Sequence, residues 1–171
     1  DNNFLESLKT GYIDKSIESD ISYVPEIITN DFNKPQKVLT TLTNSLNNCE
    51  NFYFNVAFLT KSGVISLFNT LEEIEKLGTK GKILISTYQN FTQPDGLRLL
   101  KKFSNLELRL IDRDNFHGKG YIFKKRNSYE IIIGSSNLTQ DALGKNAEYN
   151  LKIFAKNESK IINDALTLFD K

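Results

Sequence analysis

Several residue types are scarce in this sequence, and each shortage excludes a class of protein. Its 171 residues contain one cysteine, Cys49, one histidine, His117, and neither tryptophan nor methionine. One cysteine and one histidine cannot supply the four ligands of a structural zinc site, so this chain alone does not build one. We expect Cys49 to be a small buried apolar residue near a helix end, which is typical of a protein in the reducing cytoplasm.

Long apolar runs and a strong charge of one sign are also absent. The longest apolar stretches, near residues 53–59 and 131–133, fall far short of the roughly 18 residues that a membrane-spanning helix needs. The sequence therefore predicts no membrane partner. Lysine and arginine total 22 against 21 aspartate and glutamate residues, which gives a net charge of +1. A globally basic nucleic-acid-binding tail is excluded, and any anion site must be local.

Hydrophobic periodicity divides the chain into a weakly patterned start and a regular part. Residues 1–35 predict an N-terminal arm and residues 36–171 predict one domain, which we expect to belong to a longer protein because no methionine starts the chain. Helices and strands alternate over residues 38–46, 52–59, 62–77, 82–87, 94–103 and 106–111. A hairpin over residues 119–133, a helical turn at 140–143, a strand at 149–154 and a helix at 158–169 follow. The predicted fold class is α/β, with a mixed, largely parallel β-sheet and helices on both faces.

Three short polar segments interrupt the apolar strands in the second half of the chain. They are His117-Gly118-Lys119-Gly120, Gly134-Ser135-Ser136-Asn137 and Asn146-Ala147-Glu148. Residues two apart on a strand point to the same face, so His117 and Lys119 project together and the intervening glycines leave the other face bare. The same rule puts Ser135 and Asn137 on one side if the strand extends that far. Each segment alone is also typical of a turn or a solvated surface, but together they favour a phosphate site.

The order of these residues resembles the signature of the phospholipase D superfamily. That signature consists of His-x-Lys, an aspartate five residues after the lysine, and Gly-Ser-x-Asn; the single-motif nucleases of the superfamily add a downstream glutamate. The matching residues here are His117, Lys119, Gly134, Ser135, Asn137 and Glu148. The stretch from Val38 to about Phe154 also resembles the N-terminal domain of bacterial helicase- and restriction-type proteins. One position departs from the signature, because Lys124 stands where the superfamily has its aspartate, as in several nuclease branches that lack it.

The resemblance implies cleavage of a phosphodiester through a covalent phosphohistidine, with no metal or other cofactor. It implies that His117, Lys119 and Glu148 are catalytic, with Glu148 hydrogen-bonded to an imidazole nitrogen. It also implies that Lys119, Ser135 and Asn137 bind the phosphate. The mechanism needs one imidazole to attack phosphorus and a second to protonate the leaving oxygen. Because the chain has a single histidine, two copies would have to share one site on a two-fold axis, which predicts a homodimer.

A local excess of basic residues favours nucleic acid as the substrate. Between Arg98 and Arg126 nine basic residues stand against three acidic ones. The candidates for binding the nucleic-acid backbone are Arg113, Lys124, Lys125 and Arg126, although such residues are equally typical of a solvated hairpin turn. The predicted function is a nuclease acting on DNA as a module beside helicase-type domains. Two alternatives stay open: a catalytically degenerate domain that binds nucleic acid or a partner, and a phospholipase or phosphatidyl transferase.

Overall fold

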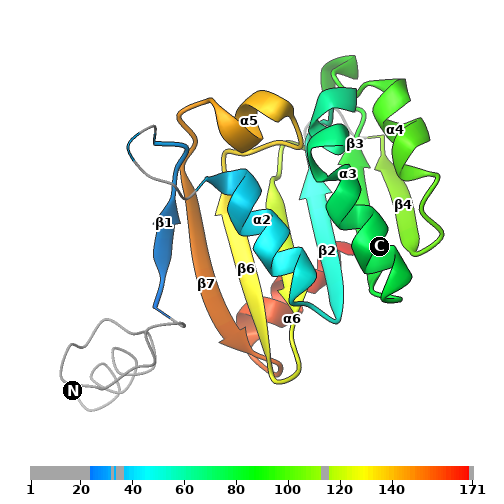
Figure 1. Cartoon of the computed structure of the whole chain (residues 1–171). Helices are drawn as coiled ribbons and strands as arrows, with labels where there is room; N and C mark the ends of the chain where they lie inside the picture. Colours follow the sequence, from blue (N-terminus) through cyan, green and yellow to red (C-terminus); the bar gives the residue numbers. More distant parts are fainter. Residues whose placement is uncertain (1–23, 32, 34–36, 113–115, 170–171) are drawn as a thin grey trace, which may run out of the picture.

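The fold is built on one mixed β-sheet with helices on both faces (Figure 1). The computed structural model describes residues 24–31, 33, 37–112 and 116–169. In chain order the elements are β1 (Glu26–Ile28), α2 (Val38–Asn47), β2 (Asn51–Val56), α3 (Lys61–Lys76), β3 (Lys80–Ser86), η2 (Tyr88–Asn90), α4 (Pro94–Leu100), β4 (Leu106–Ile111), β5 (Gly120–Lys124), β6 (Ser128–Gly134), α5 (Gln140–Gly144), β7 (Asn150–Lys156), α6 (Lys160–Leu166) and η3 (Thr167–Phe169). No helix among the described residues is long and apolar enough to cross a membrane.

The strands lie in the order β1-β7-β6-β5-β2-β3-β4. β2, β3 and β4 pair in parallel, whereas the other four pairings are antiparallel. The α/β class with a mixed sheet is confirmed, but the sheet is mostly antiparallel and not largely parallel as expected. The physical reason lies in the connections: α3 and α4 supply the crossovers that parallel pairing needs, whereas a tight turn joins β5 to β6 and makes them antiparallel.

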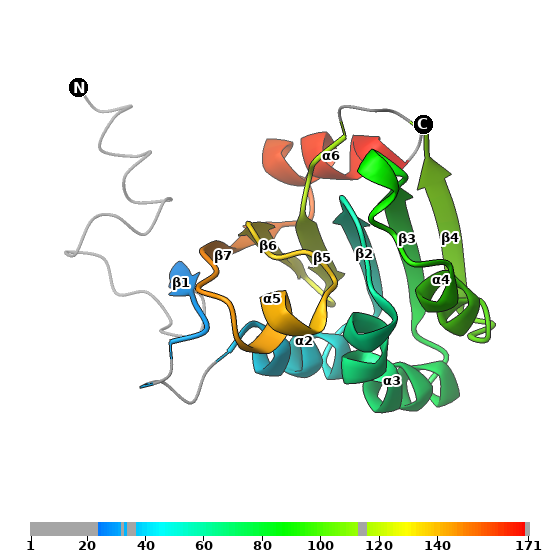
Figure 2. The same ribbon diagram turned by 90° about the horizontal axis from the view of Figure 1, so that it is seen from above.

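Two apolar layers form because successive side chains of a strand point to opposite faces. α2, α3 and α5 cover one face of the sheet and α6 covers the other (Figure 2). On β5, Tyr121 and Phe123 belong to the first core, whereas Ile122 belongs to the second with Ile162 of α6. Lys119 continues the series of Tyr121, and Lys124 continues that of Ile122. Because five residues separate them, the sequence predicts opposite orientations for these two lysines, and the alternation along β5 is consistent with this.

Some element ends differ from those expected. The sequence predicts Ser62 as the cap of this helix, whereas Thr60 caps α3 in the structure, because its Oγ1 accepts a hydrogen bond from the Gly63 N–H at 3.1 Å. The segment expected as an N-terminal arm contains β1, an edge strand that pairs with β7. With three residues, β1 is too short to show a strand periodicity in the sequence. The sequence also predicts one short helix in this arm, near residues 4–9, and these residues lie outside the described part of the chain.

One end of the sheet gathers the segments that carry the polar motifs. β2, β3, β4 and β6 end there, and β5 and β7 begin there. A parallel bridge between Leu59 and Leu138, with a hydrogen bond from Thr60 N to Leu138 O at 3.1 Å, ties the loop after β2 to the loop after β6. The loop after β6 must cross the start of β5 to reach β2, because β5 lies between them.

Candidate active site

His117 and Lys119 meet directly before β5. Lys119 Nζ lies 2.7 Å from His117 Nδ1 and 2.9 Å from the His117 carbonyl oxygen. The contact confirms that the two side chains project to the same face. Lys119 Nζ also lies 3.0 Å from His117 Nε2, so the amino group is close to both ring nitrogens. An unprotonated imidazole nitrogen has the lone pair that a nucleophile requires.

Ser135 and Glu148 form the second half of the cluster, at the end of β6 and just before β7. The Ser135 hydroxyl donates a hydrogen bond to Glu148 Oε2 and accepts one from the Tyr149 N–H at 3.0 Å. Burial lowers the pKa of Lys119 below its ordinary value, and the nearby charge of Glu148 opposes this shift. Glu148 therefore links the two halves electrostatically, and we call these four residues, His117, Lys119, Ser135 and Glu148, the His117 cluster.

The His117 cluster is open on this chain. His117 and Ser135 are exposed, and Lys119 and Glu148 are half-buried. The surface at this end of the sheet thus presents to solvent an ammonium group, an imidazole, a hydroxyl and a carboxylate. Such a set can bind an anion, attack it and move a proton, and it leaves room for a second molecule against the same surface.

Asn137 lies in the loop after β6 and contacts the residues that follow β2. Its side chain is 7% exposed, and its Oδ1 accepts a hydrogen bond from the Phe58 N–H at 3.3 Å. β6 ends at Gly134, so the two-residue alternation stops before Asn137 and cannot keep it beside Ser135. We expected Ser135 and Asn137 to share one side only if the strand extended to Asn137, and β6 ends before Ser135. Asn137 instead lies where the loop after β6 reaches the end of β2.

A buried polar network holds the loop that carries Ser135 and Asn137. The Tyr121 hydroxyl donates to the Ser136 carbonyl oxygen at 2.9 Å, and Asn150 Nδ2 donates to Ser136 Oγ at 3.0 Å. The Ser136 N–H in turn donates to Asn150 Oδ1 at 3.3 Å. Burial, with the charge of Glu148, raises the pKa of Tyr121 so that its hydroxyl remains a donor. No local pattern in the sequence indicates this network, because its members come from β5, from the loop after β6 and from β7.

The glycines of the first motif face a buried amide and not empty space. A Cβ on Gly120 would lie 2.6 Å from Asn55 Oδ1, and one on Gly118 would lie 3.0 Å from Asn55 Nδ2. Asn55 is 8% exposed on β2. The face that we expected to be bare is therefore occupied by Asn55. A polar residue between Phe54 and Val56 in an apolar strand was the signal that could have identified it.

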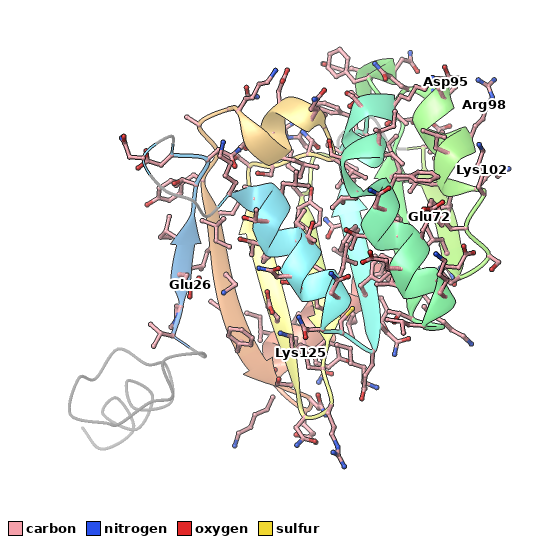
Figure 3. The ribbon with its side chains drawn as sticks, viewed as in Figure 1. Glu26, Glu72, Asp95, Arg98, Lys102 and Lys125 are labelled. Atoms are coloured by element: carbon pink, nitrogen blue, oxygen red, sulfur yellow. The ribbon has the colours of Figure 1, made fainter. Side chains whose placement is uncertain are left out.

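The basic residues of the β5–β6 hairpin lie at the other end of the sheet. At about 3.3 Å per residue, Lys124 is about 16 Å along β5 from Lys119. Figure 3 labels Lys125 at this far end, where its Nζ forms an ion pair with Glu130 at 2.8 Å beside a cavity of about 650 Å³. Lys124, Lys125 and Arg126 therefore do not lead into the His117 cluster, because the strand carries them away from it. Arg113 lies outside the described residues.

The same geometry bears on the missing aspartate of the signature. Position 124 is at the end of β5 that is remote from His117, so lysine there adds nothing to and removes nothing from the His117 cluster. The departure from the signature thus lies away from His117, Lys119, Ser135 and Glu148.

Two further expectations concern metals and Cys49. Among the described residues, no three His, Cys, Asp or Glu side chains are grouped so that they could hold a metal ion. Cys49 is half-buried just after α2, and its Sγ lies 3.2 Å from the Leu46 carbonyl oxygen. Burial raises the pKa of the Cys49 thiol to about 12, so it stays protonated at neutral pH.

The sheet, the motif residues and their grouping at one sheet end define a domain of the phospholipase D type. A family profile described as "Cardiolipin synthase, PLD-like domain" matches residues 42–171, and the chain belongs to this family of the phospholipase D superfamily. No curated protein sequence gives a match.

Solved structures share the fold at low sequence identity. NucT from Helicobacter pylori aligns with a TM-score of 0.65 and 16% identity, over 86% of this chain and 94% of that one. The phospholipase D family member Nuc from Salmonella typhimurium aligns with a TM-score of 0.60 and 19% identity, over 86% and 93%. Phosphatidylserine synthase from Haemophilus influenzae Rd KW20 aligns with a TM-score of 0.65 and 13% identity, over 97% of this chain and 43% of that one.

Proposed function

We propose that the chain is a metal-independent phosphodiesterase that cleaves DNA through a phosphohistidine, in a site completed by a second copy. The observation that carries the proposal is the 2.7 Å contact between Lys119 Nζ and His117 Nδ1, inside a cluster with Ser135 and Glu148. This contact joins a nucleophile to a cation that stabilises a phosphate. We further propose that the domain is a cytoplasmic module of a longer restriction- or helicase-type protein.

In the first step, an imidazole nitrogen of His117 attacks phosphorus. A nitrogen–phosphorus bond forms, the bond to the leaving oxygen breaks, and that oxygen takes a proton from the imidazolium of His117 in the second copy. Lys119, Ser135 and Asn137 bind the non-bridging oxygens, whose negative charge grows in the transition state. Glu148 hydrogen-bonds an imidazole nitrogen, which fixes its tautomer.

In the second step, water attacks the phosphohistidine. The water gives its proton to the imidazole that was deprotonated in the first step, the nitrogen–phosphorus bond breaks, and both histidines return to their starting states. The two imidazoles face one phosphate and titrate as a coupled pair. A single copy supplies one of them, and the open surface around His117 is where the other would approach.

The experiment that tests the proposal measures cleavage of DNA and of bis(4-nitrophenyl) phosphate in excess chelator. His117→Ala should abolish turnover on both, and Lys119→Ala should lower it about 100-fold or more. Lys80→Ala is a matched control, because Lys80 is an exposed lysine at the opposite end of the sheet, and it should behave like the native chain. Failure of the native chain to cleave either substrate, or full activity of His117→Ala, would refute the proposal.

A second candidate is a phosphatidyl transferase, which one observation favours. The fold is shared with a phosphatidylserine synthase at a TM-score equal to that of NucT. The same attack of His117 on phosphorus would then release a lipid headgroup. Release of headgroup from phospholipid vesicles, with DNA left intact, would support this candidate over the nuclease.

A further inference from the structure

An aromatic pair lies at the same end of the sheet as the His117 cluster. Phe58 follows β2, and Phe91 follows η2 at the end of β3. Their ring centroids are 5.5 Å apart with an interplanar angle of 67°, an edge-to-face contact. Phe91 is 52% exposed and Phe58 is half-buried. The pair thus presents an aromatic surface to solvent beside the candidate phosphate site.

A hydrogen bond connects this aromatic pair to the phosphate-binding motif. The Phe58 N–H donates to Asn137 Oδ1 at 3.3 Å. This hydrogen bond holds the backbone of Phe58 against the side chain of Asn137. Phe58 follows β2 and Phe91 lies beyond the end of β3. In the sheet, β2 is the neighbour of β5, and β3 is the neighbour of β2. Neighbouring strands are about 4.8 Å apart, which puts β3 about 10 Å from β5. A strand of nucleic acid held at His117 by one phosphate would pass within reach of Phe91 with an adjoining base.

The loop that carries Phe91 is held in an unusual backbone conformation. Gln89 and Asn90 have φ angles of 47° and 57°, in the left-handed region that non-glycine residues rarely adopt. The turn is closed by a hydrogen bond from Asn90 N to Thr87 O at 2.9 Å, and Gln93 N donates to Leu59 O at 3.0 Å. Two consecutive strained residues need a surrounding structure that enforces them, and such residues cluster at binding sites. Phe91 is therefore presented on a fixed loop.

We propose that Phe91, supported by Phe58, is a base-binding subsite that takes an unpaired nucleobase of the strand whose phosphate lies at His117. The subsite rests on the proposed nuclease function and narrows its substrate to nucleic acid with an exposed base. Every nucleobase has a π face, so stacking on Phe91 tolerates any sequence. In a duplex both faces of an internal base are covered by its neighbours, so the subsite selects single-stranded or frayed segments.

The test compares binding of two labelled strands with the same phosphates. One is a single-stranded oligodeoxythymidylate, and the other is an equally long strand of abasic tetrahydrofuran units. Phe91→Ala and Phe91→Leu should weaken binding of the oligodeoxythymidylate about 5- to 150-fold, and Phe91→Trp should restore it. Binding of the abasic strand should not change. The salt dependence should also keep its slope, because no phosphate contact is lost.

Leu77→Ala is the matched control, since Leu77 is a large apolar side chain, 76% exposed, at the far end of α3. It should leave both affinities unchanged. The subsite is refuted if Phe91→Ala binds the oligodeoxythymidylate like the native chain, or if the native chain binds both strands equally or neither. Hydrolysis of bis(4-nitrophenyl) phosphate is measured separately. If the native chain does not hydrolyse this substrate but still binds the oligodeoxythymidylate more tightly than the abasic strand, the nuclease proposal is wrong and the base-binding subsite is supported.

Discussion

The charge of Glu148 opposes the larger effect of burial on the pKa of Lys119. Burial lowers the pKa of Lys119, and the carboxylate of Glu148 raises it. Glu148→Gln removes the second effect, so the pKa of Lys119 should fall further and the lysine should lose its proton at a lower pH. The ε-carbon NMR shift of Lys119, followed against pH, measures this directly. Glu158→Gln, at an exposed position before α6, is the control that should leave the titration of Lys119 unchanged, and an unchanged midpoint in Glu148→Gln would contradict the account.

Cys49 provides a second test with a single residue. Burial raises its pKa to about 12, so at pH 8 the folded chain holds very little thiolate. We expect Cys49 to react with an aromatic disulfide reagent about 1,000-fold more slowly in the folded chain than in denaturant. Reaction at the same rate in both states would show that the thiol is not buried as described.

At the scale of elements, the close approach of β6 and β7 positions Ser135. A Cβ on Gly134 would lie 2.3 Å from the Tyr149 carbonyl oxygen and 2.4 Å from Asn150 Oδ1, so Gly134→Ala must push the strands apart. We expect it to lower the free energy of unfolding by about 1–3 kcal/mol, measured by urea titration. Gly144→Ala is the control, because nothing lies within 4 Å of a Cβ there. It should be neutral or slightly stabilising in α5. Equal stabilities for the two variants would contradict the packing described.

The elements themselves were largely predictable, but their partners were not. Periodicity located α2 and β4 within a residue, and the two-residue spacing brought His117 and Lys119 together. Periodicity carries no information on which strand pairs with which, so the antiparallel share of the sheet was underestimated. The strand periodicity also stops at the end of β6, so it does not predict the orientation of Asn137. The contacts of Asn55, Asn150 and Phe91 depend on residues distant in sequence, and local patterns do not report them.

At the scale of the whole molecule, we propose that one chain supplies half of the active site. The His117 cluster is exposed, and the chain has a single histidine for a mechanism that we propose needs two. If subunits must pair, specific activity should rise with protein concentration until the dimer is saturated. Sedimentation over the same range should show the change from monomer to dimer. Full activity in a sample that contains only monomers would contradict a shared site.

Mixing native and inactive chains shows whether one active site needs His117 from two subunits. Equal amounts of native chain and His117→Ala chain are equilibrated so that subunits exchange, and hydrolysis is measured at constant total concentration. If each active site needs His117 from both subunits, only dimers of two native chains turn over substrate. These are about one quarter of all dimers, so activity should be about one quarter of that of native chain alone at the same total concentration. Activity of about one half would mean that each chain works alone, and it would contradict the account.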